Sequence, residues 1–137
     1  MWILFAMLSA FFAALTSILA KIGLQNVNSN LAVAIRTIIV LIMAWAIVFF
    51  SGKHNEIANI GQRNLLFLIF SGIATGLSWL FYYRALQIGE ASKVMPVDKF
   101  SLVFGMIMAF IILKETITLK TIIGAVFITV GTFILIF

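Results

Sequence analysis

The sequence predicts an all-α integral membrane protein, and three observations lead to that prediction. Of the 137 residues, 64% are hydrophobic, only 9% are charged, and the mean hydropathy is +1.25. A soluble domain needs charge on roughly a quarter of its residues. Five segments are long enough to cross a hydrocarbon layer about 30 Å thick, which takes roughly 20 helical residues. Lipid is therefore the expected solvent, and we expect a multi-pass protein of the cell (inner or plasma) membrane.

The five spans are predicted to be helices, because lipid offers no partner to an unpaired backbone N–H or C=O group. Barrel strands alternate apolar and polar residues, whereas the stretch "VFGMIMAFIIL" does not. The predicted spans cover residues 2–20, 31–50, 65–85, 94–113 and 118–137. Short connections without low-complexity sequence join them, so we expect one domain over residues 1–137.

The first two spans carry few polar residues. The first has a face of small and hydroxyl side chains, formed by Ser9, Ala13, Thr16 and Ala20, and Lys21 follows it. The second span starts behind "NSN", residues 28–30, whose side chains are good helix N-caps. It contains Arg36, which we expect to lie within the membrane near one end of the span.

The third span follows the one long loop, "SGKHNEIANIGQRN", and combines glycines with aromatic residues. Gly72, Gly76, Trp79 and Tyr83 fall on one helical face at 100° per residue. The two glycines let another helix approach closely, most simply within the same subunit. Trp79 is nearer mid-membrane, where its indole N–H needs an acceptor or a cavity, so we interpret Trp79 and Tyr83 as a cavity wall. An interfacial aromatic belt is the alternative for Tyr82 and Tyr83.

The fourth span opens on "MPVDKF", residues 95–100, which brings a proline and two charges to an apolar segment. We expect Pro96 in the first helical turn, where its missing N–H costs little. Asp98 and Lys99 then lie about a turn deeper, at the edge of the hydrocarbon, and Gly105 shares the face of Asp98. The fifth span has Gly124 and Gly131 on one stripe, which is suited to a helix contact between subunits.

Charged residues gather on the membrane side opposite to the N-terminus. Besides Arg36, Asp98 and Lys99, this layer holds the charge cluster of Lys21, Arg84, Glu90 and Lys93. A charge inside a membrane marks a functional site by default, since it costs a few kcal/mol at the bilayer centre. The site residues predicted for substrate or ion binding are Arg36, Trp79, Tyr83, Asp98 and Lys99. The competing interpretation is a structural ion-pair network, in which Lys99 snorkels to the interface.

Orientation should follow the distribution of Lys and Arg in short loops. The side of the N-terminus carries four such residues (Lys53, Arg63, Lys114 and Lys120), and the opposite side carries five (Lys21, Arg36, Arg84, Lys93 and Lys99). Such a balance lets both orientations insert, which an antiparallel homodimer requires. A small-loop protein can also reach the same balance by chance.

Other classes of function find little support. The net charge of +5 comes without a basic stripe outside the apolar runs, so nucleic-acid binding is not expected. The absence of cysteine excludes disulfides and thiolate metal sites. There is no HExxH motif, and the lone His54 lies in a loop, so neither an enzyme nor a bound metal or cofactor is expected.

Four stretches of the chain resemble the EamA family of the drug/metabolite transporter superfamily. They are "LTSILAKIGL", "NSNLAVAIRT", "SGIATGLSWLFYYRALQIGEASKVMPVDKFS" and "LKETITLKTIIGAVFITVGTF". The resemblance is to short, single-domain bacterial and archaeal members and runs almost from end to end. It implies one five-helix repeat of a fold in which most members have two repeats of opposite topology. An antiparallel dimer, with itself or with a paralogue, would restore that arrangement around an interfacial site.

The resemblance implies secondary transport of a small metabolite or drug, most often export. Related small multidrug resistance proteins, which are also antiparallel dimers, use an acid in their first helix, but the first span here has none. Asp98, the only acid inside a predicted span, is then the candidate proton carrier. The alternative is a non-transporting membrane subunit or scaffold for another membrane protein, since five helices alone leave little room for a solute path.

Overall fold

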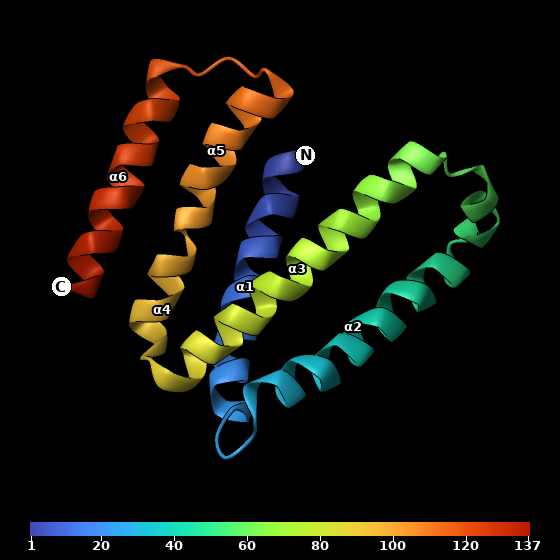
Figure 1. Cartoon of the computed structure of the whole chain (residues 1–137), viewed down its shortest axis with the longest axis horizontal. Helices are drawn as coiled ribbons and strands as arrows, with labels where there is room; N and C mark the ends of the chain where they lie inside the picture. The colour runs from blue at the N-terminus through green and yellow to red at the C-terminus, as the bar shows by residue number, and fades with distance from the viewer. The chain divides into compact units, whose positions relative to one another are not determined.

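The computed structural model describes all 137 residues, and every regular element is helical. In chain order these are α1 (Trp2–Gly23), α2 (Ser29–Phe50), the 3₁₀ helix η1 (Lys53–Asn59), α3 (Gln62–Ile88), α4 (Ala91–Asp98), α5 (Phe100–Leu113) and α6 (Leu119–Ile136) (Figure 1). Since α4 and α5 together make one apolar segment, five segments are long and apolar enough to cross a membrane. The prediction of an all-α protein with five spans is confirmed.

Apolar side chains cover the outside of these helices. In each span, at most 6% of the residues in its most apolar 18-residue window are buried. Large side chains such as Phe5, Phe81 and Phe127 are 68%, 74% and 74% exposed. Hydrocarbon accepts such a surface, whereas a soluble protein rarely exposes wide apolar patches. The chain is therefore a multi-pass membrane protein that lies in the lipid bilayer.

Close packing divides the chain into two compact units. Unit 1 consists of Met1–Ile18 and Ile88–Phe137, and unit 2 of Leu19–Gln87. The boundary falls inside α1 at one end and just before the end of α3 at the other. The assignment of residues 1–137 to a single domain stays a prediction.

Unit 2 contains α2, η1, most of α3 and the last turn of α1, and it holds a small apolar core. Leu24, Val33, Tyr83 and Leu86 are all at most 7% exposed, and Leu86 is fully buried. The predicted cap of the second helix is confirmed, because the Asn28 Oδ1 atom accepts hydrogen bonds from the N–H groups of Asn30 and Leu31. This cap fixes the start of α2 next to the buried Ser29 and Val33.

The end of α3 is tied to the last turn of α1 and to the loop between α1 and α2. Its last carbonyls have no partner inside the helix. The Lys21 Nζ atom donates to the Leu86 carbonyl at 2.6 Å, and the Gln87 Nε2 atom donates to the Val27 carbonyl at 2.7 Å. The third helix thus runs to Ile88, beyond the predicted end at residue 85, and only Gly89 and Glu90 separate it from α4.

In unit 1, α6 packs against both halves of a broken helix, α4 and α5. The break lies at Lys99, inside the fourth span predicted for residues 94–113. The helix starts at Ala91, which puts Pro96 in its second turn rather than its first. Proline there removes one helical hydrogen bond and crowds the carbonyl four residues before it. At the break, the Pro96 carbonyl accepts from the Lys99 N–H at 3.0 Å and from the Thr132 hydroxyl at 3.4 Å.

The glycines selected from the sequence lie on open faces. A methyl group placed on any of them would meet no atom of its own unit within 4 Å; the set is Gly72, Gly76, Gly105, Gly124 and Gly131. Close helix packing at these positions inside a unit is therefore not present. Their predicted role in contacts between helices stays a prediction for the assembled protein.

Candidate functional site

The predicted site residues fall into two groups, one in each unit. Arg36, Trp79 and Tyr83 lie together in unit 2, and Asp98 and Lys99 lie together in unit 1. The charge cluster is divided in the same way, with Lys21 and Arg84 in unit 2 and Glu90 and Lys93 in unit 1.

In unit 2, the Arg36 guanidinium lies over two aromatic rings of α3. Its central carbon is 4.2 Å from the centre of the Trp79 ring and 5.4 Å from that of Tyr83. The two aromatic residues are four positions apart, so they lie one above the other on the same face of α3. Tyr83 is 3% exposed, while Arg36 and Trp79 are half-buried. The site is a cation held against aromatic faces, which the sequence indicated through the helical spacing of Trp79 and Tyr83.

The energy of this contact can be compared with the cost of placing Arg36 in lipid. Arg36 lies seven residues into α2, which is about 10 Å of helix. An arginine costs roughly 3 kcal/mol at the bilayer centre on insertion scales, and less towards the interface. A desolvated cation over an aromatic face recovers about 2 kcal/mol. The two rings therefore offset much of the cost, but they leave the positive charge in place.

The other cations of this layer in unit 2 have structural partners. Lys21 binds the Leu86 carbonyl at the end of α3, and the Arg84 Nη1 atom donates to Gln87 Oε1 at 3.0 Å. Sequence reasoning grouped Lys21 and Arg84 with Arg36 by depth alone. It did not select Gln87, whose side chain accepts from Arg84 and donates to the Val27 carbonyl in the loop before α2. The only sequence feature that could have indicated Gln87 was a polar amide in the last turn of a helix.

We expect the Lys21→Met substitution to destabilise the protein by about 1–2 kcal/mol, because a hydrogen bond from a charged donor and a favourable charge at a helix C-terminus are both lost. Thermal unfolding in detergent measures the effect. The Lys93→Met variant is the control. Its ion pair with Glu90 has an N···O distance of 3.7 Å and side chains 54% and 72% exposed, so little change is expected. An equal loss of stability in both variants would show that Lys21 does not cap α3.

In unit 1, Asp98 and Lys99 stand at the break between α4 and α5. Their side chains approach to 3.7 Å and are 38% and 53% exposed. At this separation the pair is loose, and the carboxylate stays accessible. The Thr132 hydroxyl, 4% exposed, contacts the Pro96 carbonyl just before the break, and the rings of Phe100 and Phe133 meet edge to face at 5.7 Å. α6 thus holds the backbone on both sides of the only acid that lies within a span.

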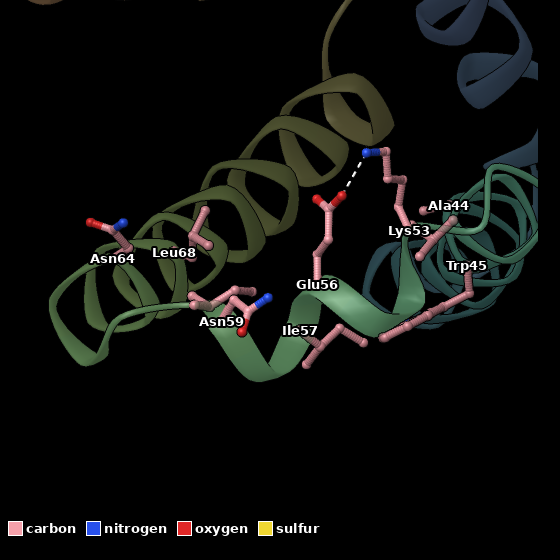
Figure 2. Close-up of a pocket in the computed structure, with 10 residues that line it drawn as sticks. Ala44, Trp45, Lys53, Glu56, Ile57, Asn59, Asn64 and Leu68 are labelled. Atoms are coloured by element: carbon pink, nitrogen blue, oxygen red, sulfur yellow. Dashed lines mark hydrogen bonds and ion pairs between the residues drawn. The ribbon is translucent and has the colours of Figure 1, made fainter.

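A recess of about 690 Å³ lies at the η1 end of unit 2. Figure 2 shows it between α2, η1 and α3, lined by Ala44, Trp45, Val48, Lys53, Glu56, Ile57, Asn59, Ile60, Asn64 and Leu68. Lys53 and Glu56, both in η1, form an ion pair at its rim with an N···O distance of 2.5 Å. Sequence reasoning did not select these residues. The feature that could have indicated them is the concentration of amide and charged side chains in the one long loop. None of the predicted site residues lines this recess.

Comparison with known proteins gives these arrangements a context. The whole chain, residues 1–137, matches the EamA-like transporter family. An uncharacterized transporter in the cobO 3′ region of Sinorhizobium is 43% identical over 134 residues, which cover 98% of this chain and 95% of that protein. An uncharacterized protein of Methanocaldococcus jannaschii is 32% identical over 83 residues, 61% of each chain. No solved structure matches the chain significantly.

The match extends over all five spans, including the half-buried Arg36 of α2 and the broken helix around Asp98. A similar length and 43% identity also relate the chain to a protein that is named as a transporter. These findings confirm the resemblance that the four quoted stretches carried. The chain belongs to the EamA-like transporter family and is a transporter of the drug/metabolite superfamily.

Proposed function

We propose that the protein is a secondary-active transporter, and specifically an exporter, of small metabolites or drugs in the cell (inner or plasma) membrane. The observation that carries the transport function is the family match over the entire chain. In this proposal the protein works by alternating access and not as an enzyme. Each conformation opens the path to one side of the membrane, and Asp98 couples the change to proton movement.

We further propose that the working unit is an antiparallel dimer. The balance of Lys and Arg between the two membrane sides supports insertion in both orientations. Two inverted copies would reproduce the inverted repeats that many transporters use, with the solute bound at the interface between them. Helices α1 to α5 would line the path. The open glycine face of α6, with Gly124 and Gly131, would join the two copies, and Gly72, Gly76 and Gly105 would allow close approach elsewhere.

Each unit supplies its own candidate substrate contacts in this proposal. In unit 2, Arg36, Trp79 and Tyr83 would contact the solute, since a cation over two aromatic rings can bind polar solutes beside an apolar surface. Asp98 and Lys99 would supply exchangeable charges at the break between α4 and α5, where helix backbone is interrupted. Discontinuous helices of this kind surround binding sites in many transporters.

Reporters fused to the C-terminus that are active on only one side of the membrane test the dimer. We expect signal from both a cytoplasmic and an extracytoplasmic reporter, because neither orientation is favoured. The Asn55→Lys/Asn59→Lys variant is the matched control; two more cations in the loop after α2 should place that loop in the cytoplasm and remove the cytoplasmic C-terminal signal. Signal on one side only from the unmodified chain would contradict self-pairing and leave the partner to a paralogue.

A further inference from the structure

Arg36 differs from the other cations of unit 2 in what neutralises it. The only acid in this unit is Glu56, which is paired with Lys53 beyond the far end of α2. Lys21 is bound to a backbone carbonyl and Arg84 to a glutamine amide. Arg36 has two aromatic rings beside it and no anion from its own unit.

The stacked geometry leaves the donors of Arg36 available. A guanidinium is planar and carries five N–H donors in its plane. Its contact with the Trp79 ring occupies none of these donors in a hydrogen bond, and their fork arrangement matches the two oxygens of a carboxylate. A water-poor environment strengthens such a pair, because less solvent competes for the donors. The site therefore suits a carboxylate better than a neutral or cationic group.

The charge of the site selects among anions. A phosphate monoester carries close to two negative charges at neutral pH, and so needs a second cation. The other cations of the charged layer in unit 2, Lys21 and Arg84, already bind groups at the end of α3. A single arginine balances a single carboxylate. We infer that Arg36, stacked on Trp79, is the recognition element for the carboxylate of a monoanionic organic solute.

This inference rests on the proposed transport function and names the chemical class of its solute. It also explains why an arginine lies against a tryptophan and a tyrosine at this site. Trp79 holds the guanidinium in place before the solute arrives, which lowers the ordering cost of binding. Tyr83, which is buried beneath the same cation, supports the orientation of the site. Arg36 then sets specificity, and Trp79 and Tyr83 position it.

Trp79 provides the test, because the chain has three tryptophans and two can be removed. A Trp2→Phe/Trp45→Phe protein, reconstituted in phosphatidylcholine nanodiscs, reports on Trp79 alone. We expect benzoate to change the Trp79 fluorescence saturably, whereas benzamide and benzylamine, its neutral and cationic analogues, do not. Arg36→Gln should weaken benzoate binding at least about tenfold, as expected for the loss of a charged, bidentate contact. Arg36→Lys should keep part of it, since charge remains but the planar fork is lost.

The control is Arg63→Gln. Arg63 also lies near an aromatic ring, 6.0 Å from the centre of Phe67, but it is exposed at the start of α3, so benzoate binding should be unchanged. Unchanged benzoate affinity in Arg36→Gln, or a stronger response to benzylamine, would overturn the inference. A full response to phosphatidylserine in the nanodisc without benzoate would also overturn it, because the carboxylate would then come from lipid. If Arg36→Gln fails to fold, the Arg36→Lys and Trp79→Phe proteins replace it. Benzoate should protect both variants against thermal unfolding less than it protects the unmodified protein, and equal protection would overturn the inference.

The binding assay is independent of transport. If benzoate does not bind while the reconstituted protein still moves a neutral or cationic solute, the carboxylate inference fails and the transport function stands. If benzoate binds through Arg36 and no solute crosses the membrane, the site stands and the transport function fails.

Discussion

The Asp98→Asn substitution is expected to abolish proton-coupled transport while leaving the assembled protein intact. Asn has nearly the same shape as Asp but cannot take up and release a proton. No other acid is available inside a span, since Glu56, Glu90 and Glu115 all lie in the connections or at their edges. The carboxylate is also 38% exposed and only loosely paired with Lys99, so its replacement removes no strong structural contact.

Proteoliposomes loaded with a mixture of radiolabelled amino acids and subjected to a pH gradient give the measurement, and cross-linking gives the oligomeric state. Glu115→Gln is the matched control, because Glu115 lies in the connection between α5 and α6 and should not affect flux. Asp98→Glu should restore part of the activity through its titratable carboxyl group. Full flux in the Asp98→Asn protein would exclude Asp98 from the coupling mechanism.

The Leu86→Ala substitution should produce the largest loss of stability, about 2 kcal/mol or more. Leu86 is fully buried in unit 2, and its carbonyl accepts the hydrogen bond from Lys21. Lipid is itself apolar, so burying a leucine side chain between helices in a membrane gains little from the hydrophobic effect. The cost of the substitution therefore comes from the packing contacts that are lost around the cavity. Unfolding in detergent with increasing dodecyl sulfate measures the change.

Phe81→Ala is the control on the same helix. It removes a larger side chain that is 74% exposed and faces lipid, so we expect it to change stability by much less. An equal or greater loss for Phe81→Ala would show that contacts outside the unit, rather than the buried end of α3, hold this part of the protein together.

The sequence predicted the spans well because lipid makes helix formation a local matter. A segment of about 20 apolar residues must satisfy its own backbone hydrogen bonds, whatever its neighbours are. The Asn28 cap was equally local, since its side chain bonds to groups two and three residues away. The fourth span was predicted, but the break inside it at Lys99 was not, although Pro96 and the charged Asp98 and Lys99 interrupt its apolar composition there. The helix begins at Ala91, which places Pro96 in its second turn, three residues before the break.

The sequence by itself determined that this chain lies in a membrane, spans it five times and belongs to a transporter family. Those properties depend on composition, local hydrogen bonding and motifs. Only the tertiary structure decided what each charged residue does. Arg36 and Lys21 were predicted to lie in the same membrane layer, yet Arg36 rests on Trp79 and Lys21 binds the end of α3. Helices that are apolar on all sides carry little signal for their rotation. Which side chains meet is therefore set by packing between helices, over distances of a few ångströms, and not by the order of residues along the chain.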